Sequence, residues 1–328
     1  MNIVVSGCAG FIGAKVSDLL LERGDCVFGL DNMSDAYDVR LKHHRLSTLS
    51  AMDGFRFFRC DISDNAALVS VCEEIKASCG DGGINCVINL AARAGVRQSI
   101  ENPWIYYSTN VMGTLNLLEF CRREEIHKFV LASTSSVYGE SETPFREDMK
   151  TDLQISQYAS SKKSAEGLCS VYNSLYGMDI SVLRYFTVYG PAGRPDMSVF
   201  RFIKWINEGE EISILGDGEQ KRDFTYVDDI ASGTVLATIN LGFEIINLGS
   251  SVSVSLNEII GMIEQGVGRK ARITCGAPHP SDIRSTLADI DKAKRILDWK
   301  PSFDTQKGIE NSLEWYNANE TFVRSIEV

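Results

Sequence analysis

The sequence alternates between strand-like and helix-length segments through its first 186 residues, and this alternation restricts the possible folds more than any other feature. Short runs rich in Val, Ile and Phe are each followed by a longer segment. Such an order is typical of a doubly wound α/β fold, in which helices cover both faces of a parallel sheet. The strand-like runs are NIVVS, CVFGLD, FRFFRCD, INCVINLA, KFVLAS and DISVLRYF, and the predicted helices cover 12–23, 65–79, 103–124 and 157–176.

The pattern changes after residue 186, where shorter helical stretches such as 199–209 stand between loops that contain Gly and Pro. We therefore predict a first domain at 1–186 and a smaller C-terminal α/β domain at 187–328. Residues 224–250 are expected to return to the first sheet. The polar stretch 32–54 is ambiguous, and its His43 and His44 are predicted to be solvated.

Composition excludes several classes of function. The 328 residues have a formal net charge of −11 and a pI near 5.0, which argues against nucleic acid and anionic membranes as partners. The nine cysteines contain no C-x-x-C pair and lie mostly in apolar runs, as expected for buried thiols in a reducing compartment. No signal peptide and no run of roughly 18 apolar residues is recognised, so we expect a cytoplasmic protein. No metal site is predicted.

The segment GCAGFIG places Gly7, Gly10 and Gly13 between the first predicted strand and the first predicted helix. Glycines there permit a tight turn, and the helix N-terminus offers N–H groups to a pyrophosphate. The second strand ends in Asp31, where a carboxylate can bind an adenosine ribose and repel a 2′-phosphate, which favours NAD over NADP. Arg40 and Lys42 follow and weaken that preference. The simpler interpretation is an ordinary turn with a surface aspartate.

A tyrosine, a lysine and a row of hydroxyls point to acid–base chemistry. Tyr158 and Lys162 are four residues apart on a predicted helix and therefore on one face. A phenol pKa must fall from about 10 to about 7 for base catalysis, which corresponds to about 4 kcal/mol. Lys162 and the positive ring of NAD⁺ are the cations expected to lower the pKa of the phenol. The hydroxyls of Ser133, Thr134, Ser135 and Ser136 end the strand before this helix, although they can also simply cap a turn.

Seven motifs, in order along nearly the whole chain, resemble the extended short-chain dehydrogenase/reductase family of nucleotide-sugar epimerases. They are GCAGFIG with Asp31, INLAARAGV (88–96), NVMGTLNLLE (110–119), ASTSSVYG (132–139), Tyr158-x-x-x-Lys162, RYFTVYGP (184–191) and RDFTYVDD (222–229). The resemblance implies a Rossmann-type NAD-binding domain followed by a UDP-binding domain, and a homodimer.

The resemblance also assigns catalytic and cofactor residues. Tyr158 is implied as the base, Lys162 as the group that holds the nicotinamide ribose, and Thr134 as the catalytic hydroxyl. The residues implied to bind NAD are Gly7, Gly10, Phe11, Ile12, Gly13, Asp31, Asn32, Asp61, Ile62, Leu90, Ala91, Ala92, Asn110, Tyr158, Lys162, Tyr185 and Val188.

Within the family, AGVRQSIENP (94–103) and GRPDMSVF (193–200) resemble the UDP-glucuronate 4-epimerases. This implies transient oxidation at C4 to a 4-keto sugar and re-reduction on the other face. Loss of CO₂ from that β-keto acid must be prevented, for which Ser135, Ser136, Thr187 and Arg194 are the candidates. The residues expected to bind the substrate, with Asp282 near them, are Arg97, Ser135, Ser136, Thr187, Arg194, Val199, Leu215, Gln220, Arg222 and Arg284.

Three alternatives remain open from sequence. The chain can instead be a 4-epimerase of neutral UDP-hexoses such as UDP-glucose, UDP-galactose or their N-acetylated forms, or a UDP-glucuronate decarboxylase. Positions 135 and 136 are serines where related dehydratases and decarboxylases carry acids, and galactose-type epimerases usually carry Asn where this chain has Thr187. Outside the enzyme class, it can be an NAD-binding regulatory module, although the intact Tyr158 and Lys162 argue against that.

Overall fold

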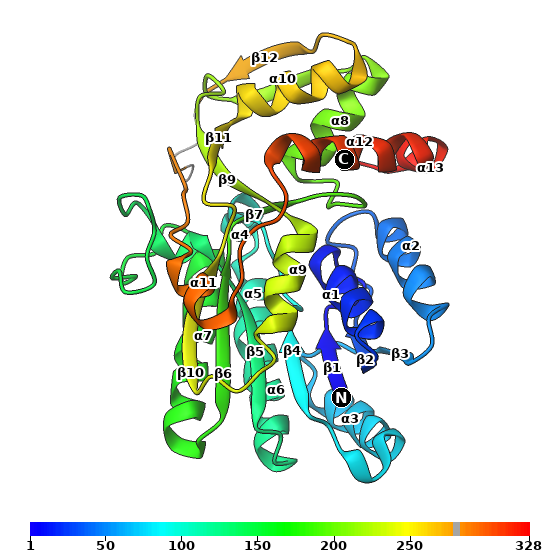
Figure 1. Cartoon of the computed structure of the whole chain (residues 1–328), viewed down its shortest axis with the longest axis vertical. Helices are drawn as coiled ribbons and strands as arrows, with labels where there is room; N and C mark the ends of the chain where they lie inside the picture. Colours follow the sequence, from blue (N-terminus) through cyan, green and yellow to red (C-terminus); the bar gives the residue numbers. More distant parts are fainter. Residues whose placement is uncertain (278–282) are drawn as a thin grey trace.

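The computed structural model describes residues 1–277 and 283–328, and its centre is a parallel sheet of seven strands. The order across the sheet is β10-β6-β5-β4-β1-β2-β3, so the chain moves outward in opposite directions from β1 (Figure 1). This is the predicted Rossmann-type doubly wound sheet. Its strands are β1 (Asn2–Ser6), β2 (Cys26–Asp31), β3 (Phe55–Arg59), β4 (Cys86–Asn89), β5 (Lys128–Thr134), β6 (Asp179–Tyr185) and β10 (Phe243–Leu248).

Helices cover both faces of the sheet because the central strands are buried and apolar on both sides, whereas the edge strand β3 keeps Arg56 and Arg59 exposed. One face packs against a cluster that includes Val16, Leu20 and Ile230, and the other against a cluster that includes Leu68 and Leu117. The helices over the first face are α1 (Phe11–Glu22), α2 (Val39–Ser50), α9 (Val227–Leu236) and α11 (Asp291–Leu297), and those over the second are α3 (Asn65–Cys79), α6 (Gly113–Arg123) and α7 (Gln157–Tyr176).

The helix predicted at 103–124 is interrupted. The chain there forms α4 (Val96–Glu101), α5 (Pro103–Tyr106), the π-helical turn η2 (Tyr107–Met112) and then α6. Asn110 lies in the π-helical turn and is buried, with its side chain bonded to both backbone groups of Arg93. The π-helical turn therefore places Asn110 in contact with Arg93, and the helical periodicity of the sequence does not predict such a turn.

The ambiguous stretch 32–54 contains α2, whose first turn is capped by the side chain of Asp38. The prediction that His44 is solvated was wrong. Its ring is half-buried and stacks on Phe322 with ring centroids 5.0 Å apart, and it meets Trp315 edge-on at 5.9 Å. The partners come from the C-terminal helices, so only tertiary packing covers this histidine.

The second half of the chain builds two small sheets and a helical layer above the large sheet (Figure 1). Of the segment 224–250, β10 joins the large sheet beside β6, whereas β9 pairs with β7 and β11 in a three-stranded sheet. The remaining elements are η1 (Gly80–Gly82), η3 (Ser135–Tyr138), β7 (Thr187–Tyr189), α8 (Ser198–Glu208), β8 (Glu211–Leu215), β9 (Lys221–Tyr226), β11 (Ser253–Ser255), α10 (Leu256–Val267), β12 (Arg272–Gly276), α12 (Thr305–Ala318) and α13 (Glu320–Ser325).

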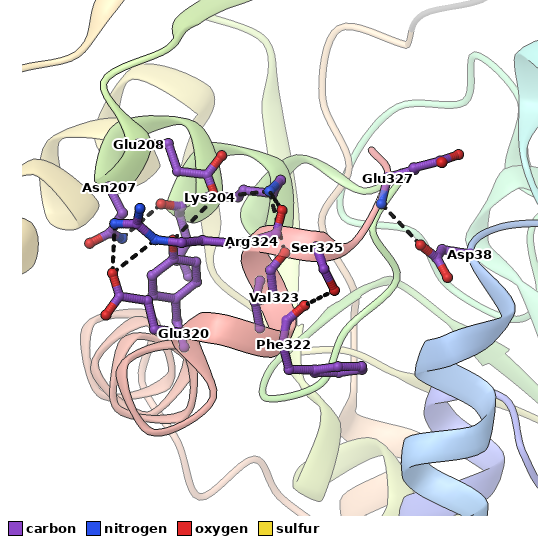
Figure 2. A network of polar contacts seen from close by, with 12 residues as sticks. Asp38, Lys204, Asn207, Glu208, Glu320, Phe322, Val323, Arg324, Ser325 and Glu327 are labelled. Atoms are coloured by element: carbon purple, nitrogen blue, oxygen red, sulfur yellow. Dashed lines mark hydrogen bonds and ion pairs between the residues drawn. The ribbon is translucent and has the colours of Figure 1, made fainter.

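The C-terminal segment connects this upper layer to α2. The backbone N–H of Glu327 donates to Asp38 at 3.0 Å, while Lys204 on α8 donates to the carbonyls of Val323 and Arg324 at the end of α13 (Figure 2). The start of α2 is thus fixed against the last residues of the chain. Among the described residues, no helix has the length and apolar character that a membrane crossing requires.

Candidate active site

A cavity of about 650 Å³ opens at the carboxyl ends of the parallel strands. It lies where the strand order reverses, between β1 and β4, which is where open α/β sheets bind ligands. Its wall includes Gly7 after β1, Asp31 at the end of β2, Leu90 after β4 and Thr134 at the end of β5. Arg222 from the upper layer closes the other side. One cavity therefore brings predicted cofactor residues together with part of the predicted substrate residues.

The glycine-rich loop lines the floor of this cavity. Its tight turn admits only glycine at two positions, because a side chain there would clash with neighbouring backbone atoms. Gly7 has a φ of 76°, and a Cβ on it would lie 2.7 Å from the backbone nitrogen of Ala91. A Cβ on Gly13 would lie 2.0 Å from the carbonyl oxygen of Gly7. Helix α1 starts at Phe11 with Gly10 as N-cap and no side-chain cap. The first turn of α1 is thus open to a phosphate group, as the sequence predicts.

Asp31 is buried at the edge of the cavity, and both of its carboxylate oxygens accept hydrogen bonds. Its Oδ1 accepts from the Met33 N–H at 2.8 Å and from the Lys42 ammonium at 3.0 Å, and its Oδ2 accepts from the Ala9 N–H at 3.2 Å. The ion pair with Lys42 is buried on both sides. A carboxylate here fits an adenosine ribose, and its negative charge is offset by Lys42.

The residues predicted to hold NAD line the cavity together, with one exception. Asp61 and Ile62 after β3 lie at its far end, where Asn32 donates to Asp61 at 2.8 Å. Asn110 does not line the cavity and instead supports the backbone of Arg93 and the hydroxyl of Ser161 from behind. The predicted NAD-binding residues that line the cavity are Gly7, Gly10, Phe11, Ile12, Gly13, Asp31, Asn32, Asp61, Ile62, Leu90, Ala91, Ala92, Tyr158, Lys162, Tyr185 and Val188. The glycine loop, the carboxylate at the end of β2 and the elongated wall together fit a dinucleotide.

Helix α7 presents Tyr158 and Lys162 to the cavity from one face. Its first turn is capped by Ser156, and it ends at Gly177 in the left-handed conformation. Lys162 is 4% exposed and donates to the carbonyl of Ala132 at 2.9 Å. Burial lowers the pKa of its ammonium to about 8, against the opposing effect of the Glu166 carboxylate. Lys162 is therefore held close to β5 with a weakened hold on its proton.

Thr134 ends β5 and faces Tyr158. Its hydroxyl accepts from the Ser136 N–H at 3.2 Å and lies at the same distance from the Ser136 hydroxyl, so the following 3-10 turn is capped. Ser133, Ser135 and Ser136 also line the cavity, and the Ser133 hydroxyl donates to Glu166. All four residues of the hydroxyl row thus border the cavity, and Ser133 also orders the buried network behind the strand.

The pKa of Tyr158 is raised by burial, while hydrogen bonding with Thr134 and the positive charge of Arg194 act to lower it. The sequence predicted two cations that act on this phenol, Lys162 and the positive ring of NAD⁺, but the Lys162 ammonium points to a backbone carbonyl. Arg194 supplies the charge from the other side of the cavity. Its guanidinium is held by two bonds to Asp196, at 3.0 and 2.6 Å.

A buried ion pair supports helix α7, which carries Tyr158 and Lys162. Glu166 lies one turn after Lys162 on α7 and bonds to Arg184 on β6 through both oxygens, at 2.9 and 2.8 Å. Burial acts to raise the pKa of Glu166, but the hydrogen bonds and charge of Arg184 outweigh it and hold the pKa below its ordinary value. The Arg184 guanidinium also lies over the Tyr138 ring. Glu166 and Arg184 therefore join α7, β6 and the hydroxyl row at the end of β5.

The residues predicted to bind the substrate fall into two groups. Ser135, Ser136, Thr187, Arg194 and Arg222 line the cavity. The others lie elsewhere: Asp282 is outside the described residues, Arg97 is exposed on α4, Val199 borders a small neighbouring void, Gln220 donates to the Leu215 carbonyl, and Arg284 borders an adjoining hollow of about 590 Å³.

Sequence reasoning missed several residues of the wall. Tyr37 and Lys42, from the ambiguous stretch before and within α2, line the cavity. A helical signal was present, since the buried positions Leu41, Lys42, Arg45 and Leu49 form a stripe in which two members are cationic. Other residues of the wall that were not predicted are Arg93, Ser108, Thr109, Met197 and Thr286.

Comparison with known proteins gives consistent results. A sequence model of the NAD dependent epimerase/dehydratase family matches residues 3–249. A relative from Thermodesulfobacterium geofontis described as UDP-glucuronate 4-epimerase is 50% identical over 326 residues, covering 99% of each chain.

Solved structures agree with the fold over nearly the whole chain. The UDP-glucuronic acid 4-epimerase from Bacillus cereus, in complex with UDP-glucuronic acid and NAD, is 36% identical with a TM-score of 0.88 and covers 97% of this chain and 99% of its own. The UDP-glucose 4-epimerase from Thermotoga maritima, with UDP-glucose, is 31% identical with a TM-score of 0.87 and covers 98% and 100%.

Proposed function

The chain belongs to the NAD-dependent epimerase/dehydratase family, and from this premise we propose that it interconverts UDP-glucuronate and UDP-galacturonate by inverting C4 of the sugar. The observation that carries the proposal is the arrangement around one cavity of the phenol of Tyr158, the hydroxyl of Thr134 and the guanidinium of Arg194, next to the glycine loop. A base, a proton relay and a fixed positive charge are what a C4 oxidation of an acidic sugar requires.

NAD, when bound along the glycine loop, supplies the acceptor and donor of the hydride at C4. Tyr158 removes the O4 proton as the phenolate, and Thr134 bonds the same oxygen and relays the proton. The resulting 4-keto sugar turns within the cavity. Tyr158 then returns the proton to O4 when C4 is reduced on its other face, so proton and hydride are both restored.

The carboxylate at C6 makes the keto sugar a β-keto acid. Ser135, Ser136 and Thr187 offer neutral donors to this carboxylate, and Arg194 offers charge, so that the C5–C6 bond is kept out of the perpendicular orientation in which CO₂ leaves. Arg222 is proposed to bind the diphosphate in the same cavity. Arg284 borders the adjoining hollow, and Ile283 lines both spaces, so the uridine end is proposed to extend toward it.

The function is tested by incubating the purified protein with UDP-glucuronate and, separately, with UDP-glucose, and identifying the products by proton NMR. UDP-galacturonate is the expected product. UDP-pentose with CO₂ would indicate a decarboxylase instead, and turnover of UDP-glucose alone would remove the glucuronate assignment. Tyr158→Phe is expected to abolish turnover while NAD still binds; full biological effect of that variant would favour an NAD-binding regulator.

The role of the serines is tested by Ser135→Ala combined with Ser136→Ala. Because these hydroxyls are proposed to orient the carboxylate, the double variant should release more pentose relative to epimer. An unchanged product ratio would count against that role.

We further infer a homodimer and a cytoplasmic location. Trp104 on α5 is 83% exposed, and exposed apolar side chains on the adjoining η2 and α7 include Met112, Val171 and Leu175. These exposed side chains support contact with a second copy of the chain, because apolar side chains gain stability when they are covered. All nine cysteines are free thiols, which supports a reducing compartment.

A further inference from the structure

One buried arginine outside the cavity connects two loops that border the cavity, the glycine-rich loop and the loop before α8. Arg45 lies on α2, is 5% exposed and reaches the glycine-rich loop at Ala9 and the loop before α8 at Ala192 and Gly193. We propose that Arg45 is a positioning residue that fixes the spacing between these loops and so limits the loss of CO₂ from the oxidised sugar. This inference rests on the proposed function and deepens it.

All five N–H donors of the Arg45 guanidinium are used. Nε donates to the Ala192 carbonyl at 3.0 Å, and Nη2 donates to the carbonyls of Ala192 and Gly193 at 2.7 and 3.1 Å. Nη1 donates to the Ala9 carbonyl at 3.1 Å and to the Tyr37 hydroxyl at 2.8 Å. A lysine has three donors on one rotating nitrogen and cannot reproduce this planar fork. Position 45 therefore requires arginine for geometry, not only for charge.

The two loops that Arg45 joins carry different parts of the site. Ala9 immediately precedes Gly10 of the phosphate loop, and its N–H also donates to Asp31. Ala192 and Gly193 immediately precede Arg194, whose charge opposes the rise in the pKa of Tyr158 that burial causes. A change at Arg45 is thus expected to disturb both ends of the cavity together.

The second loop needs an external support. Ala192 has a φ of 51°, a left-handed conformation that is unfavourable for a residue with a Cβ. Its carbonyl accepts two of the five Arg45 bonds, which hold the peptide in this orientation. Without them, the backbone before Arg194 loses the contacts that oppose its relaxation.

Helix α2 is a suitable support for Arg45 because several contacts hold its N-cap and its first half in place. The C-terminal segment binds its N-cap Asp38 (Figure 2), His44 stacks on Phe322, and Lys42 is bonded to Asp31. The Tyr37 ring lies within 6 Å of three cations, at 5.8 Å from Lys42, 5.6 Å from Arg45 and 5.8 Å from Arg194. Arg45 is therefore anchored on a fixed element.

The consequence concerns the fate of the 4-keto acid. When the C6 carboxylate is not held, the C5–C6 bond breaks, CO₂ leaves, and the electron pair forms an enolate between C5 and C4. Protonation at C5 gives the 4-keto pentose, which is released or is reduced at C4 by the hydride taken in the first step. The ratio of pentose products to epimer thus reports how firmly Arg194 and its neighbours hold the carboxylate.

The test compares Arg45→Lys and Arg45→Gln with the wild type. Both variants are expected to raise the ratio of pentose products to epimer by about tenfold, equivalent to about 1.4 kcal/mol, and to weaken NAD binding by several-fold. The ratio is measured by proton NMR and NAD binding by calorimetry. Partial unfolding lowers both products equally, so a purely structural role leaves the ratio unchanged.

Arg269→Gln is the control at an exposed position. Arg269 also donates to two consecutive backbone carbonyls, those of Ile206 and Asn207, but at the end of α8 and away from the cavity. It should match the wild type in both measurements. If the Arg45 variants are insoluble, Tyr37→Phe removes one acceptor of the guanidinium and should shift both quantities less, in the same direction.

The outcomes separate this inference from the proposed function. If the wild type makes no UDP-galacturonate, the proposed function fails. If it does, and the Arg45 variants, or Tyr37→Phe in their place, keep the wild-type product ratio or change it without any loss of NAD affinity, Arg45 does not couple the two loops.

Discussion

Glu166 on α7 and Arg184 on β6 form an ion pair, with Oε2 and Nη2 separated by 2.8 Å and both side chains almost fully excluded from solvent. Glu166 also accepts the Ser133 hydroxyl, next to Thr134. Removal of one partner leaves the other charge buried without compensation. This pair is therefore the structural centre from which the site residues on β5, β6 and α7 are positioned.

Glu166→Gln is expected to lower the free energy of unfolding by about 3 to 5 kcal/mol, because the Arg184 charge would remain buried without its counter-ion. The measurement is urea denaturation at pH 7. Glu310→Gln, which removes only an exposed pair with Lys307, should cost about 0 to 1 kcal/mol. Because the pKa of Glu166 is lowered on folding, its contribution is full above its ordinary pKa of 4.5 and is lost as the pH falls further. Equal effects of the two substitutions would contradict this.

Lys162→Met should stabilise the ligand-free protein at pH 7 while removing activity. The folded-state pKa of Lys162 is about 8, against an ordinary value of 10.5, so folding weakens its hold on a proton. The cost of burying the charged form is at most about 3 kcal/mol, is full below pH 8 and decreases to zero as the pH rises toward 10.5. Denaturation at pH 7 and pH 10 checks this. A stabilisation that is the same at both pH values would argue for packing instead.

Asp31→Asn is expected to move cofactor preference toward NADP by about tenfold or more, because the Lys42 ammonium would then face the ribose without its carboxylate partner. Lys42→Met should act in the opposite direction, since Asp31 would keep its full negative charge. The measurement is the ratio of dissociation constants for NAD and NADP. If the two substitutions shift this ratio in the same direction, charge at this pair does not set the preference.

Trp104→Glu is expected to raise the dissociation constant of the proposed homodimer by about a hundredfold, because a carboxylate buried at an apolar contact is costly. Light scattering over a dilution series gives the association state. Leu153→Glu is the control, because Leu153 is also highly exposed, at 85%, but lies in the loop before α7. A wild type that is monomeric at all concentrations would remove the dimer proposal.

Much of the fold was predictable because it depends on local patterns. The helices at 65–79 and 157–176 have the predicted bounds, and GCAGFIG forms the predicted turn, since the φ of Gly7 and the clash at Gly13 admit only glycine. The helix at 103–124 was predicted without its π-helical turn, and α2 was not predicted, because Asp38 and the cationic stripe that follows it were not recognised as a helix start.

The sequence by itself determined the order of strands and helices, the glycine floor and the placement of Tyr158 and Lys162 on one helical face, because each follows from the spacing of neighbouring residues. Tertiary structure alone decided that Lys42 pairs with Asp31, that Arg45 binds Ala9 and Ala192, and that Arg194 supplies the charge near Tyr158. Those contacts join segments up to 147 residues apart, and their energies depend on burial and orientation. The periodicity of the sequence indicates which residues share one face of a helix or strand. The residues that this face contacts are set only by the packing of the folded chain.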